Sequence, residues 1–142
     1  MRAFEAASFI AAAPEDVWGV LTDAAAWPGW DSGVTSVAGR LAIGEKVTIK
    51  VQANPGRAFP VTVTALERPA RMVFRGGMPL RLFTGERTYT LIGERGGTAF
   101  TMREEYSGPL AALIFRSIPD LGPSFRQFAE GLKQRVEGQP AS

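Results

Sequence analysis

Glu104 is the residue whose type and neighbours most clearly allow chemistry. In the segment 98–107 it alternates with Phe100 and Met102, so in a strand its carboxylate points to the same side as these apolar side chains. A carboxylate buried alone costs several kcal/mol. The sequence therefore predicts that Glu104 pairs with a cation, contacts water in a cavity or binds a polar group of a ligand.

The preceding strand-like segment offers a cation and a phenol on one side, Arg87 and Tyr89. We expect this segment to pair with the next one so that Tyr89 lies opposite Phe100. In that register Arg87 faces Met102 and lies diagonal to Glu104. A slip of one residue would turn these side chains to the other face of the sheet.

Three interpretations of Glu104 and Arg87 remain open at this point. They could form a structural ion pair near the rim of a sheet. They could orient the polar end of a ligand inside an apolar pocket. Alternatively, Glu104 could act as a general acid–base, which makes it the best candidate for a catalytic residue.

Composition excludes many other kinds of site. The chain contains no His and no Cys, which excludes thiol nucleophiles, disulfides, histidine acid–base chemistry and the usual zinc sites. The four aspartates lie far apart, and no phosphate-binding loop, dinucleotide-binding fingerprint or nucleophile elbow is present. We expect neither a metal nor a cofactor.

Charge and hydropathy argue against nucleic acid and against membrane insertion. Sixteen basic and fourteen acidic residues give a net charge of +2, and the arginines are scattered rather than clustered. The apolar run 109–118 is too short to span a bilayer and contains Arg116, while Glu5 interrupts any apolar core of a signal peptide. We expect a cytoplasmic protein with no stable membrane insertion.

Hydrophobic periodicity predicts the elements that position these residues. Apolar residues alternate with polar ones in six segments, which favours antiparallel strands with one wet face. The predicted strands are 3–10, 46–52, 58–66, 71–75, 82–92 and 98–107. A helix beginning at Pro14 and ending near Asp23 precedes a turn and loop over 24–33, and the loop 93–97 joins the last two strands.

The C-terminal part is predicted to be helical in two pieces, 109–117 and a longer helix after Pro119 and Pro123. The longer piece carries one apolar face, formed by Leu121, Phe125, Phe128, Leu132 and Val136. This face is the natural cover for the apolar side of the sheet. The sequence thus predicts one α+β domain over 1–142, in which a curved antiparallel sheet of six to seven strands wraps a long helix and encloses a ligand cavity.

Several stretches occur in the order typical of a known superfamily. Residues 11–23 lead from a strand into a helix with the pattern Pro-x-x-Val-Trp, and Trp30-Asp31 follow at the usual distance. Residues 63–74 form a strand–Pro–strand step, 96–98 a Gly-Gly-Thr hairpin and 104–108 the exit Glu-Glu-Tyr-Ser-Gly. The chain resembles the START-like, or SRPBCC, superfamily with the helix-grip fold, in its polyketide cyclase/dehydrase-like branch.

This resemblance implies three kinds of function. The first is binding of a small hydrophobic molecule, such as a lipid, a quinone or a polyketide-like compound. The second is an aromatase/cyclase or dehydrase that uses a pocket carboxylate. The third is a protein-interaction module like the chaperone activators of the superfamily, with an apolar patch around Leu110–Phe115 that could instead form the mouth of the cavity or the surface of a homodimer.

We expect a ligand to contact residues from the sheet, the Trp-Pro-Gly loop and the C-terminal helices. Trp30 could cap the cavity or pack under the short helix, and methionine side chains adapt to varied ligand shapes. The predicted ligand-binding residues are Trp30, Phe74, Met78, Arg87, Tyr89, Phe100, Met102, Glu104, Phe115 and Phe125.

Overall fold

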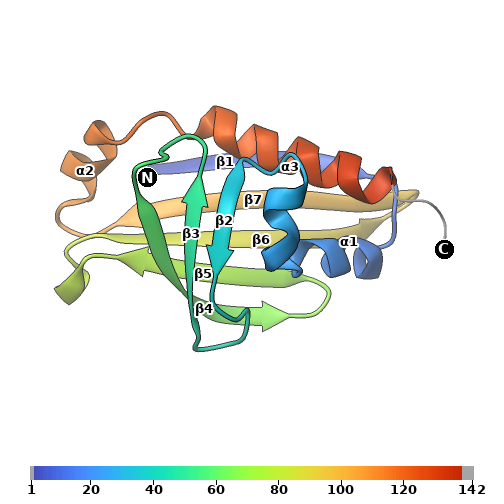
Figure 1. Ribbon diagram of the computed structural model, residues 1–142, viewed down its shortest axis with the longest axis horizontal. Coiled ribbons are helices and arrows are strands. Elements are labelled where there is room, and N and C mark those ends of the chain that lie inside the picture. Colours follow the sequence, from blue (N-terminus) through green and yellow to red (C-terminus); the bar gives the residue numbers. More distant parts are fainter. Residues whose placement is uncertain (1, 139–142) are drawn as a thin grey trace.

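The computed structural model describes residues 2–138, so residue 1 and residues 139–142 of the predicted domain lie outside this range. One antiparallel sheet of seven strands, in the order β1-β7-β6-β5-β4-β3-β2, curls around the long C-terminal helix α3 (Figure 1). This is the predicted α+β helix-grip architecture. The elements are β1 (Arg2–Ile10), α1 (Pro14–Leu21), η1 (Ala24–Gly29), β2 (Val34–Ala38), β3 (Lys46–Val51), β4 (Ala58–Glu67), β5 (Arg71–Gly77), η2 (Pro79–Arg81), β6 (Thr84–Glu94), β7 (Gly97–Ser107), α2 (Ala111–Ser117) and α3 (Gly122–Glu137).

The sequence analysis missed strand β2, which forms one edge of the sheet. Its register with β3 shifts between Val34 and Ser36, where a β-bulge interrupts the pairing. Because of the bulge, Val34 and Val37 are three residues apart, and the apolar positions do not alternate with a period of two. A search for strict alternation therefore does not detect this strand.

The predicted pairing of the last two strands is wrong by two residues. In the structure Tyr89 pairs with Met102, and Arg87 lies directly opposite Glu104. The error arises at the turn: β6 and β7 continue to Glu94 and Gly97, so the connection is only two residues long rather than the predicted five. A shift of two preserves the side-chain parity, so the predicted face was correct although the partners were not.

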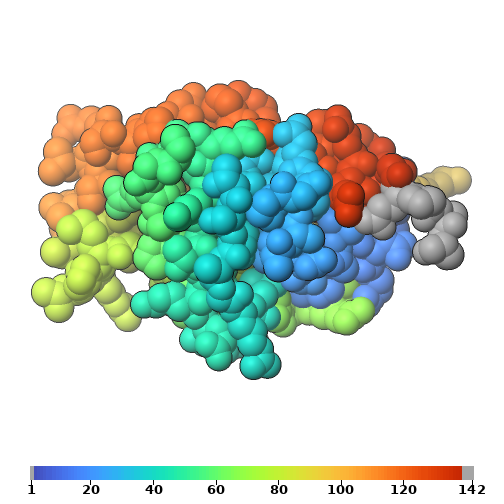
Figure 2. Space-filling view, in the orientation of Figure 1, coloured from blue at the N-terminus to red at the C-terminus, as the bar shows by residue number. Residues whose placement is uncertain are grey.

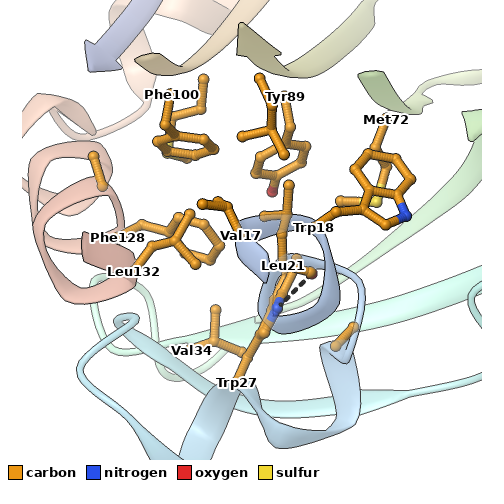
Figure 3. Close-up of a cluster of buried hydrophobic side chains, with 14 of the residues drawn as sticks. Val17, Trp18, Leu21, Trp27, Val34, Met72, Tyr89, Phe100, Phe128 and Leu132 are labelled. Carbon is orange, nitrogen blue, oxygen red and sulfur yellow. Dashed lines mark hydrogen bonds between the residues drawn. The ribbon is translucent and has the colours of Figure 1, made fainter. Parts of the chain in front are cut away.

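The main core lies between the sheet, α1, η1 and α3 (Figure 3). Trp27 of η1 is 1% exposed, and its indole N–H donates to the carbonyl of Leu21 over 3.0 Å. Its ring lies edge-on to Phe128 of α3, with 5.0 Å between the ring centroids. Trp27 thus ties the end of α1 to the long helix.

Helix α3 presents the predicted apolar face to the sheet. Phe125, Phe128, Leu132 and Val136 are buried, and Leu121 is partly buried against the core. A hydrogen bond of 2.9 Å from the Ser8 hydroxyl to the carbonyl of Ala129 fixes α3 to β1.

None of the helices within residues 2–138 is long and apolar enough to cross a membrane.

Candidate functional site

Arg87 and Glu104 form an ion pair on the inner face of the sheet. The Nε of Arg87 donates to Oε1 of Glu104 over 3.2 Å, and their side chains are only 22% and 16% exposed. The hydroxyl of Tyr106 donates to the other carboxylate oxygen, Oε2. Both oxygens of the half-buried carboxylate therefore have a hydrogen-bond donor.

Aromatic rings surround this polar group. The guanidinium of Arg87 lies over the ring of Phe125 at 4.6 Å, a cation–π arrangement. The ring of Tyr106 lies 5.6 Å from Phe83, stacked, and 5.6 Å from Phe115 of α2. The sequence analysis named Phe115 and Phe125 as ligand contacts, and the structure brings both to the ion pair.

Burial and charge together perturb the ionisable groups of the cluster. Burial opposes the charge on Arg87, but the Glu104 carboxylate together with Tyr89 and Tyr106 outweighs burial, and the pKa of the guanidinium is raised. Burial, with the added effect of Glu104, raises the pKa of Tyr106. Arg87 is therefore a fixed positive charge and Tyr106 a neutral hydrogen-bond donor.

Tyr89 is the next residue on the same face of β6, and its hydroxyl is buried without a hydrogen-bond partner in residues 2–138. Figure 3 shows its oxygen pointing from the sheet toward α1. Burial raises the pKa of Tyr89, and the nearby Arg87 guanidinium acts against this shift. An unsatisfied buried hydroxyl is costly, so its retention needs a reason.

Two glycines leave the sheet without side chains beside the ion pair. Gly76 of β5 pairs with Gly85 of β6. This pair lies next to the pair of Phe74 and Arg87 on the inner face of the sheet. A Cβ added to Gly85 would lie 3.4 Å from the ring of Tyr106 and 3.8 Å from the Glu104 carboxyl carbon. At Gly76, strand β4 fills this space, because an added Cβ would lie 3.0 Å from the Pro60 oxygen and 3.2 Å from the Val61 side chain. Gly85 therefore forms the bare patch that adjoins Arg87 and Glu104.

The inner face is fully buried at one end and half-open at the other. Tyr89, Phe100 and Met102 are no more than 1% exposed. By contrast, Phe59, Val61 and the two glycines are partly exposed. The half-open part adjoins α2 and the start of α3, so a ligand could reach the ion pair from this end.

The structure places most of the predicted ligand-binding residues either in the ion-pair cluster or in the packed core, and places Met78 and Trp30 elsewhere. The ion-pair cluster contains Arg87, Glu104, Phe115 and Phe125, and the packed core contains Phe74, Tyr89, Phe100 and Met102. Met78, at the end of β5, is 42% exposed. Trp30 packs on Phe128 of α3 and lines a crevice of about 350 Å³ whose other lining residues come from α1, η1 and α3 and include no member of the ion-pair cluster.

Some residues of the cluster were absent from the predicted set. Tyr106 has the parity of Glu104 and could have been included on that ground. The position of Gly85 beside Tyr106 could not have been predicted, because it depends on the pairing register of β6 with β7. Within residues 2–138 no three acidic side chains converge in a way that could hold a metal ion.

Comparisons with known proteins agree with this architecture. The model of a family described as polyketide cyclase/dehydrase and lipid transport matches residues 1–137. A search of curated proteins finds no match.

Solved structures share the fold at low sequence identity. Protein MLL2253 from Mesorhizobium loti is 19% identical, with a TM-score of 0.76 over 99% of this chain and 100% of that one. A START superfamily protein from Mycobacterium smegmatis is 16% identical, with a TM-score of 0.70 over 96% and 97%. The di-domain ARO/CYC BexL of the BE-7585A biosynthetic pathway is 18% identical, with a TM-score of 0.72 over 98% of this chain and 51% of that one.

Proposed function

Since the chain belongs to the polyketide cyclase/dehydrase and lipid transport family, we propose that it binds a small hydrophobic molecule with an oxygen-bearing polar end, such as a lipid, a quinone or a polyketide-like compound. The ligand lies on the half-open inner face of the sheet, beside Gly85, with its polar end at Arg87. The observation that carries the proposal is the half-buried Arg87–Glu104 pair beside this bare patch.

The remaining donors of Arg87 specify the chemistry of the polar end. Its Nε donates to Glu104, whereas its terminal amino groups meet no acceptor in hydrogen-bond geometry within the described residues, although the Tyr89 hydroxyl lies near them. A guanidinium offers five N–H donors and no acceptor. It therefore suits a carbonyl, carboxylate or phenol oxygen, and not an amine.

Glu104 supports this binding role through Arg87. Its two oxygens accept hydrogen bonds from Arg87 and Tyr106, which holds the guanidinium in place over Phe125. The pair is neutral as a whole, so a ligand need not carry a full charge. Apolar walls provide most of the affinity, since each buried apolar Å² contributes roughly 25 cal/mol.

The variant Gly85→Val tests the position of the ligand. Its side chain would occupy the bare patch next to Tyr106, and valine suits a strand. We expect it to weaken binding of the fluorescent fatty acid cis-parinaric acid or of an anthraquinone about tenfold or more, as overpacking of a site does. The control is Thr88→Val, on the opposite face of the same strand, which should bind normally.

Equal affinity of Gly85→Val and the unmodified protein would place the ligand elsewhere. Failure of both probes to bind, together with native mass spectra showing no small molecule in gently purified protein, would refute the proposed function itself.

An aromatase/cyclase or dehydrase is the second candidate, supported by the family description and by the similarity to an ARO/CYC structure. The geometry gives each oxygen of Glu104 one hydrogen-bond donor, and each oxygen keeps a lone pair that could accept a proton from a substrate. If the protein is an enzyme of this class, Glu104→Gln should abolish turnover of a polyketide substrate and retain its binding. Unchanged turnover would exclude Glu104 as the acid–base.

A further inference from the structure

We infer that the end of the molecule formed by η2 and α2 docks on the surface of an anionic lipid bilayer. The docking surface consists of Leu80 and Arg81 of η2 with Leu113 and Arg116 of α2. It lies outside the ligand site but forms part of the wall beside it.

The apolar residues of this surface are unusually exposed. Leu80 is 91% exposed, more than any other large hydrophobic side chain in residues 2–138, and Leu113 is 60% exposed. Met78, next to η2, is 42% exposed. Exposed apolar side chains that gather at one place usually mark an interaction site.

Two separate segments of the chain bring these side chains to one end. The backbone N–H of Leu110, just before α2, donates to the carbonyl of Leu82, just after η2, over 2.9 Å. Gly108 packs so closely against this segment that an added Cβ would lie 2.7 Å from the Leu82 oxygen. Figure 2 shows α2, in orange, and the η2 segment, in yellow-green, at the same end of the molecule.

The backbone of η2 is held in an unusual conformation that keeps Leu80 outward. Leu80 and Arg81 have φ angles of 61° and 55°, in the left-handed region that residues other than glycine rarely adopt. A strained loop of this kind persists only where surrounding contacts fix it, and such loops occur often at functional sites.

The charges beside the apolar side chains favour an anionic bilayer over other partners. Arg81 and Arg116 are exposed and form no ion pair within the described residues. Leu113 and Arg116 are three residues apart on α2 and therefore project from one side of it. Peripheral membrane proteins insert apolar side chains such as leucine below the lipid headgroups and place arginine at the level of the phosphates.

The size of the surface also favours a bilayer. A stable protein interface uses roughly 20–30 residues on each side with complementary shape. Here a few side chains project from the two short helices η2 and α2, and a fluid bilayer can accept them without a matching shape.

The docking segments also contact the candidate site. Phe83, just after η2, and Phe115 of α2 both pack on the Tyr106 ring, and Tyr106 donates to Glu104. A bilayer held at this end would therefore adjoin the half-open part of the inner face.

Co-sedimentation with vesicles tests the docking surface directly and requires no ligand. The full chain should bind vesicles of phosphatidylcholine mixed with phosphatidylglycerol, bind pure phosphatidylcholine weakly, and lose affinity as salt rises. The double variant Leu80→Ser/Leu113→Ser should lose affinity for the vesicles tenfold or more, because each substitution removes one apolar side chain that the bilayer would bury. The double variant Arg81→Gln/Arg116→Gln should lose affinity for anionic vesicles about tenfold or more, because each charge contributes on the order of fivefold to this affinity.

Matched controls separate this surface from general hydrophobicity and charge. Ile43→Ser/Ile92→Ser removes two side chains that are 65% and 57% exposed elsewhere on the molecule, and should bind as the unmodified protein does. Arg40→Gln/Arg95→Gln makes the same charge change at exposed positions outside the surface, and should have less effect than the Arg81 and Arg116 pair. Circular dichroism and thermal unfolding confirm that each variant is folded.

Several results would overturn the inference. They are absence of binding to anionic vesicles, equal losses in the control variants, and unchanged binding of Leu80→Ser/Leu113→Ser. Light scattering that shows a dimer abolished by Leu80→Ser/Leu113→Ser, without vesicle binding, would assign the surface to a second copy of the chain. Each of these outcomes leaves the ligand-binding assay with Gly85→Val unaffected, so the two proposals fail independently.

Discussion

At the scale of single residues, the two tyrosines of the chain occupy contrasting environments. The hydroxyl of Tyr106 has a partner in Glu104, whereas the hydroxyl of Tyr89 is buried without one. Both lie on the inner face of the sheet and flank the ion-pair residues. The folded protein therefore bears an energetic cost at Tyr89.

The same chemical change at the two tyrosines should have opposite effects on stability. Tyr89→Phe removes an unpartnered hydroxyl and should raise the free energy of unfolding by about 1 kcal/mol, whereas Tyr106→Phe removes a hydrogen bond to a carboxylate and should lower it by about 1–2 kcal/mol. Urea denaturation of the ligand-free protein measures both. A loss of stability in Tyr89→Phe would mean that its hydroxyl has a partner in solution.

At the scale of elements, the position of α3 depends on a close approach to the segment after η1. A Cβ on Gly131 would collide with the backbone oxygen of Asp31. Glycine is required there because the helix and the loop are in direct backbone contact. This contact holds α3 above the core and leaves its N-terminal part over Arg87.

Two glycine-to-alanine variants in helices test this close approach. Gly131→Ala should force α3 away from the loop and lower the free energy of unfolding by about 1–3 kcal/mol. Gly19→Ala is the control, because nothing lies within 4 Å of its added Cβ on α1, and it should raise stability by about 0.5–1 kcal/mol. Thermal unfolding of both variants measures the difference, and equal effects would contradict the contact.

At the scale of the whole molecule, the absence of His and Cys shapes the response to pH. Between the carboxylates and the tyrosines no side chain titrates, so stability should be nearly constant from about pH 6 to pH 9. At acid pH, Glu137 contributes: the Lys133 ammonium and the Ala11 N–H lower its pKa. This contribution is present above the ordinary carboxyl pKa of about 4.3 and is lost as pH falls below it.

At alkaline pH the two buried tyrosines should destabilise the fold. Burial raises the pKa of both Tyr89 and Tyr106, so the unfolded chain loses these protons more readily than the folded one. Their contribution is complete below about pH 10, the ordinary tyrosine pKa, and is lost as pH rises above it. Urea midpoints across this range measure the effect, and it should diminish in Tyr89→Phe and Tyr106→Phe.

The sequence by itself determined the elements that depend on local patterns. Side-chain periodicity predicted five strands after the first helix and the apolar face of α3, and backbone chemistry predicted that α1 begins at a proline. The structure confirms these elements. Side-chain parity also placed Arg87 and Glu104 on the same face. The bulged strand β2 was missed because its periodicity is broken.

Tertiary structure alone decided which residues meet. The direct pairing of Arg87 with Glu104 follows from a two-residue turn, and the same register places Gly85 opposite Tyr106. The exposure of Leu80 and Leu113 and the packing of Tyr89 depend on segments far apart in the chain. Periodicity reports which face a side chain is on, but register and the approach of distant backbones set its partners, and these are properties of the folded chain as a whole.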